Sequence, residues 1–237
     1  MESQYKIRKE VIEMSPDTVF TLHLANHSIA VTTSIVIQWV IMAIIIILAL
    51  ILTRNIETIP SKRQSVLELF VETINGLVKS NMGDDFKSFV PFIGTMAIFL
   101  CFLNLTGLVG VEPSTKDINV TAGFALMSFV VIQATSIKRI GVGGYLKSYL
   151  QPFAPMIVMN IIEKVTLPLS LCLRLFCNML VGSMIIGLVY GALKNFAFVI
   201  PIPLHGFFDI FDGLIQMYVF MMLTMVYTKI AVSEGEE

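Results

Sequence analysis

The sequence is poor in charge: only 14% of its 237 residues are Asp, Glu, Lys or Arg, whereas 56% are hydrophobic. Soluble proteins carry roughly a quarter charged residues, so this composition indicates an integral membrane protein whose first partner is the lipid bilayer. The net charge of −1 leaves no basic surplus. A nucleic-acid binder would need that surplus, so no nucleic-acid partner is expected.

Cysteine and histidine are also scarce, with three of each. Cys101, Cys172 and Cys177 all lie in apolar stretches, which indicates small buried side chains and neither a disulfide nor a metal site. The three histidines are scattered, and no nucleophile, base or metal constellation accompanies them. We therefore expect no catalytic residues, no metal and no cofactor. No stretch matches the GxxxxGK[ST] phosphate-binding loop, so nothing indicates that the chain binds ATP itself.

Long uncharged runs occupy most of the remaining sequence. A bilayer core of about 30 Å requires about 20 helical residues. This length predicts spans at 30–53, 89–110 and 118–137, a helix pair or one long helix at 153–193, and a last helix at 207–232. The fold class is therefore an all-α polytopic bundle of about five spans, in a single membrane domain over 1–237 with an N-terminal tail at 1–29.

The segment 61–82 differs from the spans because apolar and charged residues alternate in it at helical spacing. The apolar face contains Val66, Leu67, Phe70, Val71, Ile74 and Val78, and the opposite face contains Lys62, Arg63, Glu68, Glu72 and Lys79. This pattern predicts an amphipathic helix that lies on the membrane surface.

The charges between the spans predict an orientation. Residues 138–151 contain Lys138, Arg139 and Lys147 and no acid, whereas residues 111–117 contain charges of both signs. The positive-inside rule places the first segment in the cytoplasm and the second outside. With five spans, the N-terminus is then expected outside and the C-terminus in the cytoplasm.

One arginine, Arg174, lies in residues 165–193, which contain no other charge. A charge near the bilayer centre costs about 3 kcal/mol on insertion scales, so it requires a partner or a water-lined path. The alternative, a side chain that reaches the membrane surface, is disfavoured because the nearest lysines, Lys164 and Lys194, are far along the helix. Arginine stays protonated at any accessible pH. We therefore interpret Arg174 as a functional cation that must not titrate.

Three polar residues share a helical face with Arg174. At 100° per residue, Glu163, Ser170 and Asn178 fall on the same stripe. A hydrogen bond to a neighbouring helix explains Asn178 as well as a functional role does, and a bond to its own backbone explains Ser170 equally well. Further along, Ser183, Gly187 and Gly191 form a small-xxx-small ridge, which is typical of close helix packing.

The last predicted helix has a polar face of its own. His205, Asp209, Asp212 and Gln216 follow one another at spacings of 4, 3 and 4 residues among Phe, Ile, Leu, Met and Tyr. Acids that complement the helix dipole in a first turn would explain Asp209 and Asp212, but they would not explain Gln216 deeper in the helix. His205 follows the sequence PIP and is interpreted as a loop residue, not as a metal ligand.

Three stretches, in order, resemble subunit a of the F-type ATP synthases. The motif LRLFGNMxAG of that family resembles LRLFCNMLVG in this sequence. The family's second and third membrane helices, with their connecting loop, resemble PFIGTMAIFLCFLNLTGLVG followed by PSTKDINVTAGFAL, and its last helix resembles IQMYVFMMLTMVYTKIA. The similarity runs from about residue 28 to 232.

The resemblance implies a non-catalytic stator of the membrane Fo sector in a bacterial cell membrane. Its implied partners are the c-subunit ring, the b-subunit peripheral stalk and the remainder of the ATP synthase complex. Two long, tilted, antiparallel helices would face the ring and couple ion flow through two half-channels to ring rotation and ATP synthesis. The implied ion-translocation residues are Arg174 opposite the ring carboxylate, Gln216 beside it, Asn178 of the motif, Glu163 towards the inner half-channel, and Asp209, Asp212 and His205 in the outer one. Ser170, on the Arg174 stripe, and Ser183, nine residues after Arg174, are further candidates for ion translocation.

Two positions depart from the family pattern. Cys177 stands where the family usually has glycine, and Ser183 stands where many members have Glu or His. That Glu or His elsewhere pairs with the position seven residues before the glutamine, which is Asp209 here. A Na⁺-coupled form of the same subunit remains an alternative to the proton form. A secondary transporter is a second alternative, disfavoured because the sequence has no inverted repeat.

Overall fold

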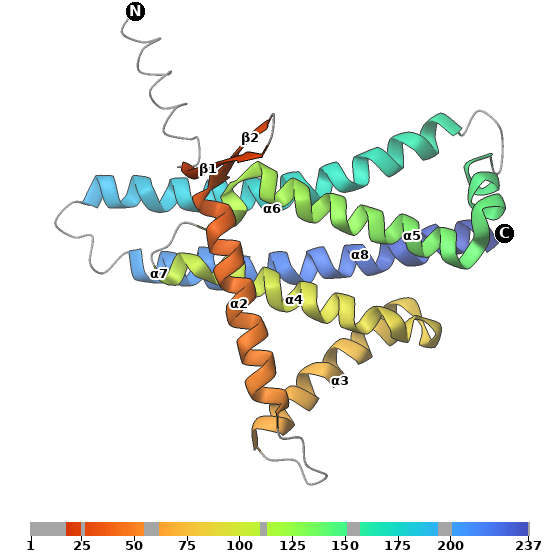
Figure 1. Cartoon of the computed structure of the whole chain (residues 1–237), viewed down its shortest axis with the longest axis horizontal. Coiled ribbons are helices and arrows are strands. Elements are labelled where there is room, and N and C mark those ends of the chain that lie inside the picture. Colours follow the sequence, from red (N-terminus) through yellow and green to blue (C-terminus); the bar gives the residue numbers. More distant parts are fainter. Residues whose placement is uncertain are drawn as a thin grey trace, which may run out of the picture.

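The computed structural model of the chain describes residues 18–24, 27–54, 62–109, 113–150, 157–193 and 201–236 (Figure 1). Its elements, in chain order, are β1 (Thr18–Leu24), β2 (His27–Thr32), α2 (Thr33–Thr53), α3 (Lys62–Met82), η1 (Asp84–Phe89), α4 (Val90–Leu105), η2 (Thr106–Val109), η3 (Ser114–Lys116), α5 (Ile118–Leu150), α6 (Ile157–Leu193), α7 (Pro201–His205), η6 (Gly206–Asp212) and α8 (Gly213–Glu236). Five described segments are helical, long and apolar enough to cross a membrane: Thr33–Thr53, Asp84–Leu108, Ile118–Tyr145, Ile157–Ala192 and Ile202–Ser233. The polytopic helical class is confirmed.

A short hairpin precedes the first span and is the one part of the described chain that is not helical in character. β1 and β2 pair in antiparallel register, with Thr18 opposite Thr32 and Leu24 opposite His27. The sequence interpretation treated residues 1–29 as a tail and missed this hairpin. Its signal is the alternation in TVFTLHL, which has the period of two that is typical of strands. Residues 1–17 and 25–26 lie outside the described residues.

The long helices form a bundle around α5, which packs against both α6 and α8, while α4 packs against α8. In Figure 1, α6 and α8 run in opposite directions on either side of α5, and α2 crosses their common direction. This arrangement agrees with the prediction of two long antiparallel helices in a helical membrane bundle. The most deeply buried apolar side chains are those of Ile93, Leu100, Leu103, Ile132, Leu171, Leu175 and Met225, at the contacts of α4, α5, α6 and α8.

Small hydroxyl side chains line the contact between α5 and α8. Ser136 of α5 donates a hydrogen bond of 2.7 Å to the carbonyl of Ala231 on α8. Thr224 and Thr228 of α8 are fully buried and donate to carbonyls one turn earlier in their own helix, at 2.8 and 2.6 Å. Small residues let membrane helices approach closely, and carbonyls of the same helix satisfy the buried hydroxyls.

The apolar residues of the amphipathic helix α3 lie in two environments, one buried against the bundle and one exposed. Ile74, Val78 and Met82 are buried, and α3 packs against α4 and α8. Val66 and Val71 remain 68% and 55% exposed. The exposed part of the apolar stripe supports the proposal that α3 lies at the membrane surface, because exposed valines are stable against lipid.

Helix α5 extends beyond the predicted end of the third span. Residues 138–150 were expected to form a connecting segment, but they are helical apart from a break at Gly141, which has a φ of +79°. Only glycine adopts that left-handed conformation without strain. After the break, Tyr145 donates a hydrogen bond of 2.7 Å to the side chain of Gln133, which ties the second part of α5 back to the first.

The structure decides between the two alternatives for 153–193. In the described part, α6 is one long helix from Ile157 to Leu193 with Pro168 inside it, and not a helix pair. The sequence PIPLHG was expected to be a break, but Pro201–His205 forms α7, which continues through the π-helix η6 into α8. Prolines are tolerated there because the first turn of a helix has unpaired backbone N–H groups.

The interpretation of the cysteines as uniformly buried is correct only in part. Cys172 is buried and lies 3.6 Å from the hydroxyl of Thr121. Cys101 is partly buried, and Cys177 is exposed. The apolar surroundings in the sequence could not separate these cases, because an apolar residue of a membrane protein faces either the core or the lipid.

Candidate functional site

Arg174 lies near the middle of α6, on a face that the rest of the chain leaves open. Its neighbours Leu171 and Leu175 are buried, whereas Arg174 is exposed and Leu173 is 42% exposed. Arg174 makes no hydrogen bond or salt bridge with any residue that the structure describes. A guanidinium on an apolar surface at membrane depth is costly without a partner. The residues that the structure describes therefore do not include the partner that Arg174 requires.

Gln216 lies on α8 and is 8% exposed. Its side chain is hydrogen-bonded to that of Asp212, one turn earlier. The structure does not bring Gln216 into hydrogen-bond contact with Arg174, although both residues are described. Over most of their length α6 and α8 are separated by α5, so the last helix meets α6 mainly through α7 and η6.

The remaining polar residues of the last helix form a hydrogen-bonded group. Nδ1 of His205 lies 2.7 Å from Oδ2 of Asp209, and Nε2 of His205 lies 3.3 Å from the hydroxyl of Tyr190 on α6. The exposed fraction of the side chain falls from 30% at His205 to 8% at Asp209. His205 is the last residue of α7, Pro201–His205, so it belongs to a helix and not to a loop. Because the helix begins at Pro201, Asp209 and Asp212 do not lie in its first turn, and the helix-dipole explanation does not apply to them.

Asp209 belongs to the π-helix η6, Gly206–Asp212. Short π segments within α-helices are frequent at functional sites, because the wider turn redirects the side chains on either side of it. Here the segment carries Asp209 against η2, where a Cβ added to Gly107 would lie 2.8 Å from the carboxyl carbon and from both carboxyl oxygens. A larger residue at position 107 would therefore force the Asp209 carboxyl group to move.

Asn104 fixes the start of α8. Its Nδ2 donates a hydrogen bond of 2.9 Å to the carbonyl of Gly213, and the residue is 1% exposed. A Cβ on Gly213 would lie 3.0 Å from Cβ of Asn104, so the two helices touch here. The sequence analysis missed Tyr190, Gly107 and Asn104. The asparagine in the apolar run FLNLTG was the available signal, because a buried amide requires a partner.

A cavity of about 230 Å³ connects several of the predicted residues. Its wall includes Asn178 and Ser183 of α6, His205 and Asp209 of the last helix, and Lys116 of η3. At about 30 Å³ per water molecule, this space is large enough for several waters. We call it the His205 cavity. The structure therefore brings together four of the residues predicted for ion translocation.

No helix that the structure describes packs against the glycines of the Ser183 ridge. A Cβ added to Gly187 or Gly191 would meet no atom within 4 Å, so no described helix packs closely against them. Ser183 and Gly187 instead line the His205 cavity. The hydroxyl of Ser183 donates to the carbonyl of Leu180 at 2.9 Å, within its own helix.

Glu163 lies towards the other end of α6. It is exposed and lines a cavity of about 30 Å³ together with Asn160, Lys164, Gln133 and Tyr227. We call this the Glu163 cavity. Ser170, also on the predicted stripe, is exposed and lines neither cavity. The polar stripe of α6 thus reaches two separate cavities, with Arg174 between them in the sequence.

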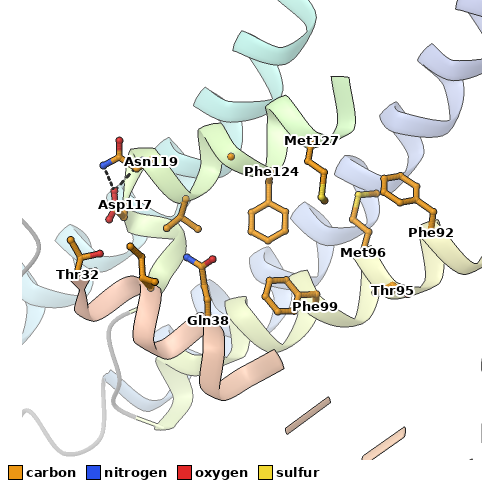
Figure 2. A pocket seen from close by; sticks show the side chains of 13 residues that line it. Thr32, Gln38, Phe92, Thr95, Met96, Phe99, Asp117, Asn119, Phe124 and Met127 are labelled. Atoms are coloured by element: carbon orange, nitrogen blue, oxygen red, sulfur yellow. Dashed lines mark hydrogen bonds between the residues drawn. The ribbon is translucent and has the colours of Figure 1, made fainter. Parts of the chain in front are cut away.

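A third and larger cavity, of about 660 Å³, lies between α2, α4 and α5 (Figure 2). Polar residues stand at one end of it, where Asp117 accepts hydrogen bonds from the backbone and side-chain nitrogens of Asn119 at 3.0 and 3.1 Å. The rest of the wall includes aromatic and sulfur-containing side chains, together with the polar residues Thr32, Gln38 and Thr95. The aromatic and sulfur-containing residues are Phe92, Met96, Phe99, Phe124 and Met127. None of the predicted site residues lines this cavity, so it is separate from the polar path.

The fold and these polar groups define a multi-pass membrane protein with ionisable residues inside its helical bundle, the class that includes ion-translocating proteins. Among the described residues, no group of three His, Cys, Asp or Glu side chains could hold a metal ion. The sequence matches the family described as ATP synthase A chain over residues 35–229.

Curated relatives agree with this match. The chain is 36% identical over 205 residues to ATP synthase subunit a 2 of Bradyrhizobium sp., covering 86% of this chain and 90% of the relative. It is 36% identical over 218 residues to ATP synthase subunit a of Trichlorobacter lovleyi, covering 90% and 93%. It is 29% identical over 242 residues to the sodium ion specific subunit a of Propionigenium modestum, covering 94% and 83%. The chain belongs to the ATP synthase subunit a family.

Proposed function

We propose that the chain is the non-catalytic stator of the Fo sector and guides ions to and from the ring of c subunits. The observation that carries this proposal is the placement of two polar cavities towards opposite ends of α6 with a lone exposed arginine between them. At 1.5 Å per residue, Ser183 lies about 14 Å along the helix from Arg174 in one direction, and Glu163 lies about 16 Å in the other.

Two separate half-channels are what rotary coupling requires. Moving one elementary charge through 100 mV is worth about 2.3 kcal/mol, and this work is lost if the ion crosses in one continuous channel. In the proposed mechanism an ion boards a ring carboxylate from one cavity, travels through lipid as a neutral site, and leaves into the other. Arg174 stands between the cavities, and its charge favours the ionised carboxylate. This promotes release and blocks a direct leak.

The two cavities take different roles in this proposal. The His205 cavity, with Asn178, Ser183 and Asp209 in its wall, is the outer half-channel, and Asp212 with Gln216 bounds it on α8. The Glu163 cavity is the inner half-channel, and Ser170 lies on the ring-facing surface between them. The assignment of sides follows from the cationic residues Lys138, Arg139 and Lys147, which place that end of α5 in the cytoplasm. The N-terminus is then outside and the C-terminus inside a bacterial cell membrane.

The c ring is the proposed partner of the Arg174 face. Large apolar side chains on α6 surround the arginine and are exposed, among them Leu169, Val181, Met184 and Leu188. Such a surface fits a membrane-embedded helix that carries one carboxylate. The b-subunit peripheral stalk and the rest of the ATP synthase complex are the further partners that the family membership supports.

Proton coupling is the first proposal for the transported ion, because an imidazole–carboxylate pair lies in one cavity and both groups bind protons. Sodium coupling is the alternative, favoured by the similarity to the relative from Propionigenium modestum that is named as sodium ion specific. ATP-driven transport that needs no sodium and collapses with a protonophore is the expected result. Strict sodium dependence would support the alternative.

The substitution Arg174→Ala tests the stator function. In the complete ATP synthase reconstituted in liposomes, we expect it to abolish ion-driven ATP synthesis and ATP-driven pumping, while ATP hydrolysis by the detached head is retained. Copurification of the c ring and the peripheral stalk with the wild-type chain would exclude a secondary transporter, which has no ring partner. Normal coupled synthesis in the Arg174→Ala complex would refute the proposal.

A further inference from the structure

His205 lies beside the Asp209 carboxylate in the wall of the His205 cavity. The α6 side of the His205 cavity offers Ser183, whose hydroxyl hydrogen is donated to Leu180 within its own helix. We propose that His205 is the proton carrier of this half-channel and passes protons between the cavity and Asp209. It would replace, from within the last helix, an acid or imidazole on α6. This inference rests on the proposed function and deepens it.

The distances fit a hydrogen-bonded relay. The imidazole bridges two oxygen atoms, with Asp209 Oδ2 at 2.7 Å from Nδ1 and the Tyr190 hydroxyl at 3.3 Å from Nε2. Exposure decreases along the relay, because Tyr190 is 45% exposed and Asp209 is 6% exposed. A proton that reaches Asp209 from bulk water therefore enters through the cavity that both side chains line, and His205 is the titratable group hydrogen-bonded to Asp209.

The proton transfer balances without any further reactant. A hydronium ion that enters the cavity from bulk water gives a proton to Nε2 of the neutral imidazole and leaves as water. The N–H bond at Nδ1 then breaks as the O–H bond at Oδ2 of Asp209 forms. The imidazole is neutral again, with its hydrogen on Nε2. The first tautomer returns when the ring turns Nδ1 towards the cavity, where Nδ1 gains a proton from water as Nε2 gives one to water. Imidazole suits this task because one ring nitrogen can accept a proton while the other donates one.

The shape of the cavity explains why the carrier can lie on the last helix. A Cβ on Gly182 would lie 3.2 Å from the ring of Phe208, so α6 and η6 approach closely just beside the relay. The small Ser183 next to this contact leaves space in front of His205. The other charged groups near the pair are Lys116 in the same wall and Asp212 on the next turn.

The test compares two variants of His205 in the complete ATP synthase in membrane vesicles. His205→Gln retains a side chain that can bond to Asp209 but cannot carry a proton, and His205→Ala opens space for added imidazole. General acid–base groups contribute roughly 10² to 10⁴-fold, so we expect ATP-driven proton pumping to fall at least tenfold in both. We expect added imidazole to restore pumping in His205→Ala only. Copurification of the c ring shows that each variant assembles, and His205→Gln decides the question if His205→Ala does not assemble.

A second-site variant adds an independent readout. Because position 183 faces the same cavity, Ser183→His in the His205→Gln background should recover pumping. Tyr190→Phe, which keeps the ring and removes the hydroxyl, should reduce pumping less than His205→Gln does. Pumping at the wild-type rate in His205→Gln would overturn the inference, as would a fall that neither imidazole nor Ser183→His reverses. If Arg174→Ala is uncoupled while His205→Gln pumps normally, the stator function stands and only this inference fails.

Discussion

Gly107 is the position where one added methyl group tests the geometry of the proposed outer half-channel most directly. The Cβ of Gly107→Ala would lie 2.8 Å from Cγ, Oδ1 and Oδ2 of Asp209, whereas ordinary contact begins at 3.4 Å. The carboxyl group would have to move by about 0.6 Å or rotate away. It is held in place, because its Oδ2 lies 2.7 Å from Nδ1 of His205.

The size of the effect follows from these contacts. Overpacking a filled site costs about 1 to 3 kcal/mol. Losing a hydrogen bond to a charged group costs about 1.5 to 3 kcal/mol. Since about 1.4 kcal/mol is a factor of ten in a rate, we expect Gly107→Ala to reduce proton flux about tenfold or more if the Asp209 geometry limits the flux.

The assay is ATP-driven acidification of vesicles that contain the complete ATP synthase, followed with a pH-sensitive dye. Gly76→Ala on α3 is the matched control, because a Cβ there meets no atom within 4 Å. Alanine at an exposed helix position is also favoured over glycine by about 1 kcal/mol. The amount of copurified c ring is used to correct the pumping rate of each variant for its degree of assembly. Equal pumping by Gly107→Ala and Gly76→Ala would refute the argument that the contact between Gly107 and Asp209 positions the carboxyl group for transport.

Two further predictions concern neighbouring residues. Asp209→Asn should slow proton flux severely in the same vesicles, because the amide cannot accept the proton that His205 delivers; unchanged flux would reduce Asp209 to a structural position in η6. Asn104→Leu removes the 2.9 Å hydrogen bond to the Gly213 carbonyl and leaves that carbonyl buried, at a cost of about 1 to 3 kcal/mol. Its complex should lose the subunit at a lower temperature in detergent than the wild type does, and an unchanged transition would contradict the inferred role of Asn104.

Much of the membrane architecture could be read from the sequence, because the bilayer imposes a length and a polarity on each span. The uncharged run at 30–53 and the helix α2, Thr33–Thr53, agree closely. The amphipathic pattern at 61–82 also corresponds to one helix, α3. Both patterns are local, and a helical period is visible within a few turns of the chain. The isolation of Arg174 in an apolar run was equally visible.

The sequence interpretation was less successful at the breaks between helices. Glycines and prolines marked residues 138–151 and PIPLHG as connecting segments, yet only Gly141 interrupts the described part of the first, and the second begins a helix. A proline or glycine does not by itself distinguish a helix start from a loop. That choice depends on the packing of the flanking residues, as with Tyr145 and Gln133.

The sequence by itself determined that this is a polytopic membrane protein with one permanent cation in a span, because span length and charge are local properties. Only the tertiary structure decided which polar residues meet. The bond between Asn104 and Gly213 joins residues 109 apart in the sequence, and the bond between Ser136 and Ala231 joins residues 95 apart. A helical periodicity relates residues only a few turns apart in the sequence, so it cannot reveal contacts between residues so widely separated. For the same reason Tyr190, His205 and Asp209 became one group only when α6 and the last helix were packed together.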